Sequence, residues 1–319
     1  MAVPVELLAC PACRGSLDVA LTCGGCGAAW PAPDGIPALR VAGDARTETV
    51  RLFYETAPFP GYPRRDSLAW LRARAERSRF ARLLDSSIGG DALVAEIGCG
   101  TGQMSLYLAR ADRKIVALDL SRAALRLGAA AAQRYGVEPV LFVEADLSRL
   151  PLRDEAFDVV YCSGVLHHTP DPAAAFSRIV PAVRPNGVVM VGLYNRLARI
   201  PLRLRRAVAR LSNYRWIPGD PVLRDRDAEP ARREAWIRDQ YRHPEEHRHS
   251  VSEVRRWFEA SGIDYLRTYP STITGDEPED LFAPAGDEWA LETWIAQLGW
   301  MRSLGPEGGL FVAVGRRRG

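Results

Sequence analysis

Ten residues decide the fold class of this chain: Val94-Ala95-Glu96-Ile97-Gly98-Cys99-Gly100-Thr101-Gly102-Gln103. They predict a buried strand that runs into a glycine-rich turn, because three alternating glycines let the backbone adopt a positive φ and approach a ligand closely. Residues 104–111 are expected to form a helix directly after this turn, with the positive end of the helix facing the same place. A strand, a glycine turn and a helix N-terminus together predict a site for a nucleoside ligand.

A second strand is expected over residues 114–119, and it ends on Asp119, 23 residues after Glu96. In a doubly wound α/β fold, this is where a carboxylate meets the hydroxyls of a ribose. The dinucleotide fingerprint is G-x-G-x-x-G, but here the third glycine is Gly102 and Gln103 stands in its place. An acid at the end of the first strand would also repel a pyrophosphate. The pattern therefore favours a cationic nucleoside over a dinucleotide.

The glycine turn and three later segments resemble, in the same order, the motifs of class I S-adenosylmethionine (SAM) dependent methyltransferases of the type 11-like group. The later segments are 142–147, 157–168 and 184–191. The resemblance covers roughly residues 90–195. It implies an α/β, Rossmann-like, doubly wound sheet of seven strands with an antiparallel last strand. It also implies an enzyme that uses SAM as its cofactor.

By this resemblance, the SAM-binding positions of the family fall on twelve residues of this chain. They are Glu96, Gly98, Cys99, Gly100, Gly102 and Gln103 at the first turn, Asp119 and Leu120 after the second strand, Ala145, Asp146 and Leu147 after the third, and Ser163 after the fourth. In the family the second-strand acid binds the ribose and the third-strand acid contacts the adenine amino group. Asp119 and Asp146 are expected to do so here.

The candidate catalytic residues follow the fourth and fifth strands. Ligands of open α/β sheets bind outside the carboxyl ends of the strands, so His167 and Tyr194 are expected beside the methyl donor. His167 is the candidate general base because histidine titrates near neutrality, whereas His168 is expected to be a structural histidine. His243 is a third candidate, as part of a substrate-pocket wall. A metal site of His243 with His247 is the alternative interpretation, which the proline after His243 disfavours.

Four of the six cysteines form two C-x-x-C pairs, Cys10 with Cys13 and Cys23 with Cys26. Such pairs predict a tetrahedral Zn²⁺ site of four thiolates. Four protein ligands leave no open position, so the ion would be structural and would supply folding energy, about 10–16 kcal/mol in comparable peptides. Redox-active dithiols are the alternative. The segment resembles the small zinc-ribbon domains that precede or accompany bacterial methyltransferases.

The expected domain organisation has five parts: a zinc ribbon (1–44), a linker with an N-terminal helix or lid (45–90), the SAM-binding core (91–195), an insertion or lid (196–250) and the C-terminal part of the sheet (251–319). The proline-rich stretch 53–63 is expected not to form regular helix, and one helix is expected from Asp66 or Ser67 to about Asp85. In the insertion, a helix is expected to carry a stripe of arginines on a solvated face: Arg199, Arg203, Arg206 and Arg210.

Composition narrows the function further. The net charge is +3 and 47% of residues are hydrophobic, which predicts a globular chain without a strong anionic partner. No apolar run reaches the roughly 18 residues of a membrane span and no signal peptide is visible, so a cytoplasmic location is expected. The favoured function is methylation of a small-molecule acceptor on oxygen, nitrogen or carbon. An RNA or protein methyltransferase that grips its substrate with the ribbon and the arginine helix is the alternative, and a SAM-sensing protein without turnover is a third. The oligomeric state is not indicated.

Overall fold

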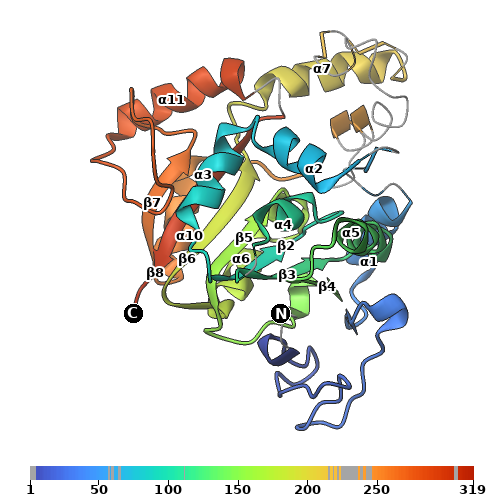
Figure 1. The fold of residues 1–319 in the computed structure, drawn as a ribbon. Coiled ribbons are helices and arrows are strands. Elements are labelled where there is room, and N and C mark those ends of the chain that lie inside the picture. Colours follow the sequence, from blue (N-terminus) through green and yellow to red (C-terminus); the bar gives the residue numbers. More distant parts are fainter. Residues whose placement is uncertain are drawn as a thin grey trace.

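The computed structural model describes residues 5–56, 58, 61–63, 66–110, 112–214, 216–217, 219–220, 223, 236–237, 240–241, 246–304 and 308–319. Its centre is one mixed sheet with helices packed on both faces (Figure 1). The strands are β1 (Ala38–Leu39), β2 (Leu93–Ile97), β3 (Lys114–Asp119), β4 (Val140–Ala145), β5 (Phe157–Ser163), β6 (Val183–Tyr194), β7 (Ile263–Tyr269) and β8 (Leu310–Arg317). The helices are α1 (Ala45–Glu55), α2 (Leu68–Ala75), α3 (Arg79–Ser87), α4 (Gln103–Leu108), α5 (Arg122–Tyr135), α6 (Pro172–Ile179), α7 (Ile200–Leu211), α10 (Val251–Ala260) and α11 (Ala290–Ser303).

The strands are hydrogen-bonded in the order β1-β4-β3-β2-β5-β6-β8-β7. The first six of these run parallel, whereas β8 runs antiparallel to both β6 and β7. The doubly wound topology and the antiparallel last strand are thus confirmed. The expected count of seven strands is wrong, because β1 adds an eighth at the edge beside β4. A strand of two residues is too short to show a hydrophobic period in the sequence.

Each face of the sheet carries its own apolar layer, because successive side chains of a strand point to opposite faces. In β2, Val94 packs in the layer that includes α3, α4 and α5, whereas Ala95 and Ile97 pack in the layer that includes α6 and α10. The central strands are therefore buried on both faces, which explains their nearly continuous apolar sequence.

Side-chain caps set the starts of several helices. Ser121 and Asp171 each accept a backbone N–H at the start of α5 and α6, and Pro201 lies in the first turn of α7. The single helix expected between Asp66 and Asp85 is wrong. The helix α2 ends at Ala75, and the Ser78 hydroxyl caps a separate helix, α3.

The stretch expected to be irregular, 53–63, begins in a helix, because α1 extends to Glu55. Asp44 caps α1 by accepting the Thr47 N–H at 2.8 Å. The first proline of this stretch is Pro58, so no proline prevents a helix over residues 53–57. The Ser121 hydroxyl donates to Glu55 at 3.2 Å and thereby links α1 to the start of α5.

The arginine stripe of the insertion is not solvated along its whole length. Arg199, directly before α7, is fully buried and ion-paired with Glu246, and Arg206 pairs with the same carboxylate at 2.5 Å. The expected solvated face is therefore wrong for Arg199, because a desolvated guanidinium is tolerated only beside a counter-charge. Arg203 and Arg210 are exposed. No helix in the described ranges combines the length and the apolar character that crossing a bilayer requires.

The N-terminal segment packs at the β4 edge of the sheet (dark blue in Figure 1). Leu8 forms an isolated bridge with Leu152, in the loop that follows β4. Leu7, Leu8 and Leu17 are buried in the same apolar layer as Val143 of β4. The segment expected as a separate zinc ribbon thus shares its core with the sheet.

Candidate active site

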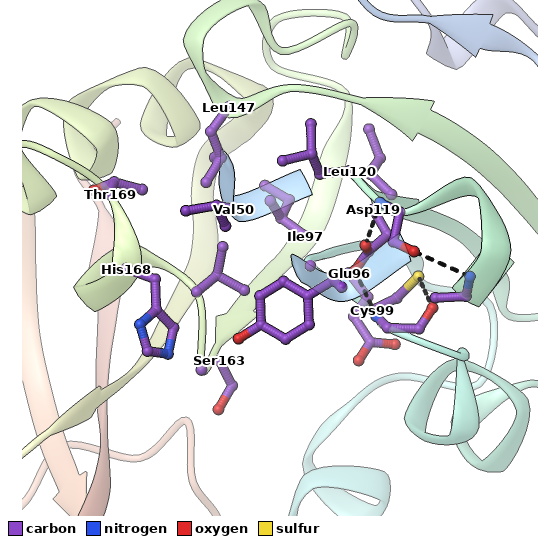
Figure 2. A pocket seen from close by; sticks show the side chains of 18 of the residues that line it. Val50, Glu96, Ile97, Cys99, Asp119, Leu120, Leu147, Ser163, His168 and Thr169 are labelled. Carbon is purple, nitrogen blue, oxygen red and sulfur yellow. Dashed lines mark hydrogen bonds between the residues drawn. The ribbon is translucent and has the colours of Figure 1, made fainter. Parts of the chain in front are cut away.

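A cavity of about 580 Å³ lies at the carboxyl ends of the parallel strands, on either side of the point where the strand order reverses between β2 and β5. This is the position and size expected for a ligand site in an open α/β sheet. Figure 2 shows side chains from α1 and from the ends of β2, β3 and β5 converging on it. Eleven of the twelve expected SAM positions line the cavity: Glu96, Gly98, Cys99, Gly100, Gln103, Asp119, Leu120, Ala145, Asp146, Leu147 and Ser163.

The twelfth position, Gly102, is not among the cavity-lining residues, but it allows the backbone of the turn to pass close to Phe142. Its φ is 73°, and a Cβ at this place would lie 2.5 Å from the ring of Phe142. Gly98 is equally constrained, with φ of 75° and a Cβ that would lie 1.9 Å from Val165 Cγ2. The turn after β2 therefore folds tightly against β4 and the loop after β5, which only glycine permits.

Asp119 fixes the glycine turn and also lines the cavity. Its carboxylate accepts the Gly100 N–H at 2.7 Å and the Ser121 N–H at 2.8 Å (Figure 2). Burial raises the pKa of Asp119 above its ordinary value, while these N–H groups oppose the rise. The side chain is thus held in one orientation beside the cavity.

Asp146 lines the cavity and carries a buried carboxylate oxygen without a hydrogen-bond partner in the described part of the chain. Its Oδ1 accepts the Ser148 N–H at 2.7 Å, while its buried Oδ2 has no hydrogen-bond partner among the described residues. A buried polar atom without a partner is costly, so a ligand that donates a hydrogen bond at this position would be favoured.

Glu96, at the end of β2, is buried and accepts a hydrogen bond from the Ser105 hydroxyl of α4. Burial raises the pKa of Glu96 to about 7, against a usual 4.5. A cationic ligand beside this buried carboxyl would stabilise its ionised form, whereas an anionic ligand would destabilise it.

The two adjacent histidines lie differently from the expectation. His167 is fully buried and is not part of the cavity lining, whereas His168 lines the cavity (Figure 2). The cause is the short 3₁₀ turn Leu166–His168, which rotates neighbouring side chains about 120° apart. The structure brings His168 to the site and places His167 behind Tyr194.

Tyr194 lines the cavity and lies between two other side chains. The ring of His167 stacks on it at a centroid distance of 3.8 Å, and the guanidinium carbon of Arg199 lies 3.6 Å from its ring centroid. The Tyr194 hydroxyl accepts a hydrogen bond from Gln240 Nε2 at 3.0 Å. The candidate His243 lies outside the described residues.

Comparison with known proteins agrees with this geometry. Residues 95–191 match a family model described as a methyltransferase domain. This part of the chain is a methyltransferase domain. A ubiquinone biosynthesis O-methyltransferase of Ralstonia nicotianae is 36% identical over 107 residues, which cover 33% of this chain and 44% of that protein. An uncharacterized protein of Synechococcus sp. is 28% identical over 261 residues, which cover 70% of this chain and 60% of that protein.

The magnesium protoporphyrin IX methyltransferase of Synechocystis PCC 6803 with bound S-adenosylhomocysteine (SAH) has a similar structure. The TM-score is 0.50 at 14% identity, over 85% of this chain and 99% of that one. This likeness shows that the methyltransferase domain has the fold of that protein. The chain spans 44–60% of the length of the two curated relatives named above.

Several cavity residues lie outside the methyltransferase domain, in the two segments that were expected as lids, but none of them was expected individually at the cavity. Arg46, Thr47, Val50 and Tyr54 come from α1, and Trp236 and Gln240 come from the insertion. The spacing of positions 47, 50 and 54 is that of one helix face, so a helical interpretation of this segment would have found them. No pattern in the sequence marks Trp236. The indole N–H of Trp236 donates to the buried Asp220 at 3.2 Å, which holds the ring at the cavity.

The four cysteines of the N-terminal segment come together. The Sγ atoms of Cys10, Cys13, Cys23 and Cys26 all lie within 4.8 Å of one another. Cys10 and Cys26 are 3.8 Å apart, and Cys13 and Cys23 are 3.4 Å apart, close to the roughly 3.8 Å edge of a Zn–S₄ tetrahedron. The Cys26 backbone N–H is the main cause that lowers the pKa of Cys23 to about 6, which favours a thiolate. The donor set fits a zinc ion.

Proposed function

We propose that this chain is a SAM-dependent methyltransferase that methylates a small, largely apolar acceptor on oxygen, nitrogen or carbon. One observation carries the proposal. The three acids Glu96, Asp119 and Asp146 and the glycine turn line a single cavity, at the place where the strand order of the sheet reverses between β2 and β5. The residues fit the donor: Asp146 lines the cavity with a buried Oδ2 that has no partner among the residues that the structure describes, which supports a contact with an adenine amino group, and Asp119 lines the cavity after β3, which supports a contact with the ribose. When bound, SAM supplies an electrophilic methyl group.

The remainder of the cavity suits an acceptor with an apolar body. Val50, Tyr54 and Trp236 provide apolar and aromatic walls from α1 and the insertion. These side chains exclude water, which strengthens any electrostatic interaction within the site. Tyr194 is the polar group at the cavity's insertion side, with its hydroxyl oriented by Gln240.

His168 takes the role that the sequence favoured for His167. It lines the cavity next to Thr169 and can accept a proton from an acceptor hydroxyl or amine, or orient that group. Replacing His168 with Ala should lower turnover by about 10²-fold or more while SAH affinity stays within a factor of about two. Replacing His167 with Ala should instead lower stability, because it leaves a void behind Tyr194. Equal turnover of His168→Ala and the unaltered chain would show that His168 neither accepts the proton nor orients the acceptor.

A small acceptor is favoured over RNA or protein because two of the four stripe arginines, and the neighbouring Arg205, form internal ion pairs. Arg199 and Arg206 both pair with Glu246, and Arg205 lies 3.5 Å from Asp220. The relative from Ralstonia nicotianae is named for O-methylation in ubiquinone biosynthesis, which is consistent with a small acceptor. We propose a structural zinc ion at the four cysteines, with no part in the transfer step.

The test is transfer of a radiolabelled methyl group from SAM to separate cell-extract fractions of small molecules, RNA and protein. Label in the small-molecule fraction is expected. Label in the RNA or protein fraction alone would mean that the acceptor is a macromolecule and not a small molecule. SAH binding without label in any fraction would favour a sensing role.

A further inference from the structure

The loop after β4 forms one wall of the cavity and is held from behind by the N-terminal segment. Asp146, Leu147 and Leu150 of this loop line the cavity. On its other side, the Ala9 N–H donates to Pro151 O at 3.0 Å, and the Arg153 N–H donates to the carbonyl of Leu7 at 2.9 Å. The wall therefore lies between the ligand space and the segment that carries the cysteines.

Arg14 makes the side-chain part of this contact. Its guanidinium donates to Leu150 O at 2.5 Å and to Leu152 O at 2.8 Å, and it pairs with Asp154 at 2.5 Å. Leu150 lines the cavity, and Leu152 forms the isolated bridge with Leu8. One side chain thus fixes the path of the loop over three consecutive residues.

The cysteine cluster in turn fixes Arg14. Arg14 directly follows Cys13, and its N–H donates to the Cys10 carbonyl at 2.8 Å. Its φ is 69°, in the left-handed region that favours glycine and, less strongly, asparagine and aspartate over arginine. A strained arginine at a turn position where glycine would fit points to a role for the side chain. The turn from Cys10 to Arg14 thus directs the guanidinium toward the loop after β4.

We infer that Arg14 is a positioning residue for the nucleoside half of the methyl donor, and that the four-cysteine cluster sets donor affinity through it. The inference rests on the proposed function, because it takes the cavity as the donor site. The loop carries Asp146, the acceptor assigned to the adenine amino group. Displacement of the Leu150 and Leu152 carbonyls would move that acceptor and the apolar wall beside it.

The contact with Asp154 is a matched internal control. Both partners of this ion pair are about half exposed, and exposed pairs contribute little free energy. Removing it with Asp154→Asn leaves both carbonyl hydrogen bonds of Arg14 in place. A second control is Arg126→Ala, which breaks the exposed Arg126–Asp34 pair between the N-terminal segment and α5 without touching the loop.

The experiment is calorimetric titration of SAH into the full chain, with zinc per chain and thermal midpoint measured for each variant. Arg14→Ala is expected to weaken SAH binding by about tenfold or more with zinc content unchanged. Arg14→Lys can restore one of the two carbonyl contacts, so its affinity should fall between those of Arg14→Ala and the unaltered chain. Asp154→Asn and Arg126→Ala should stay within a factor of about two.

Removing the metal from the unaltered chain with a chelator should weaken SAH binding at least as much as Arg14→Ala, and zinc should restore it. SAH affinity that is unchanged in both Arg14 variants, or unchanged in the metal-free chain, overturns the inference. If the unaltered chain fails to bind SAH, the proposed function itself is refuted. If Arg14→Ala does not fold, the Arg14→Lys measurement decides.

Discussion

At the residue scale, the backbone at Gly98 tolerates no side chain. A Cβ would meet Val165 at 1.9 Å, and the positive φ would cost an alanine about 1–2 kcal/mol. Gly98→Ala should therefore displace the turn and weaken SAH binding by at least about tenfold, as measured by calorimetry. Gly90→Ala is the control, because a Cβ there meets nothing within 4 Å. Unaltered affinity in Gly98→Ala would show that the turn does not contact the donor.

The buried Glu96 carboxyl makes stability depend on pH in an identifiable window. Its folded pKa of about 7 lies above the usual 4.5, so the folded state retains a proton that the unfolded chain has lost. This contribution is fully present below pH 4.5 and is lost as pH rises through about 7, a fall of about 3 kcal/mol in the free energy of unfolding at most.

Glu96→Gln removes the titrating group and keeps an acceptor for Ser105. The difference in unfolding free energy between the variant and the unaltered chain, from urea titrations at pH 5 and pH 8, isolates the Glu96 contribution from other titrating groups such as His249. We expect that difference to shift in favour of the variant as pH rises. A difference that is constant with pH would mean that Glu96 is ionised in the folded protein at pH 5.

Residue-scale features were predictable where spacing along the chain fixes them. Glu96, Asp119 and Asp146 each end or follow a strand, and strand ends of a parallel sheet meet at one edge. The choice between His167 and His168 was not predictable. One 3₁₀ turn separates the two directions, and the stacking of His167 on Tyr194 is a tertiary contact that no local pattern shows.

At the element scale, the segment that forms α1 was expected as a lid but not as a regular helix, and the N-terminal cap of α1 allows its contribution to be tested. Asp44→Ala removes the acceptor of the Thr47 N–H and should cost about 1 kcal/mol of stability. Because Arg46, Thr47 and Val50 line the cavity from the first turns of α1, SAH or acceptor affinity should fall as well.

Ser250→Ala is the matched variant, since Ser250 caps α10, a helix that contributes nothing to the described cavity lining. Chemical denaturation should show a similar loss of stability in the two variants, with weakened binding in Asp44→Ala alone. Equal binding in both would mean that α1 covers the cavity without contributing to affinity.

Elements with a clear period or a side-chain cap were predictable, and the others were not. The parallel strands, α5, α6 and the late antiparallel pair follow from apolar runs and from caps such as Ser121 and Asp171. The two-residue β1 depends on tertiary contacts that no local pattern encodes, whereas the cap residue Ser78 was a local signal for the break between α2 and α3 that was missed. Composition also misled at α1, where nearby prolines obscured a regular helix.

At the scale of the whole molecule, the N-terminal segment shares its core with the sheet, so the cysteine cluster should affect global stability. A chelator that removes the metal should lower the thermal midpoint of the entire chain in a single cooperative transition, because Leu8 and Leu17 pack in the same layer as β4. Calorimetry with metal analysis measures this. A metal-free chain with an unchanged midpoint would show that the cluster holds no structural ion.

The domain-level organisation shows what sequence alone leaves open. The cysteine spacing predicted the cluster correctly, since two C-x-x-C turns bring four sulfurs together. The docking of that cluster on the loop after β4 depends on single contacts such as Arg14 with Leu150, which no spacing rule predicts.

The account depends most on the cavity between β2 and β5 being a SAM site. Titration of the purified chain with SAH in a calorimeter tests this directly. We expect saturable binding of one SAH per chain, which is abolished or strongly weakened in Gly98→Ala and retained in Gly90→Ala. Absence of binding by both SAM and SAH, with saturable binding of NADH instead, would contradict the central claim.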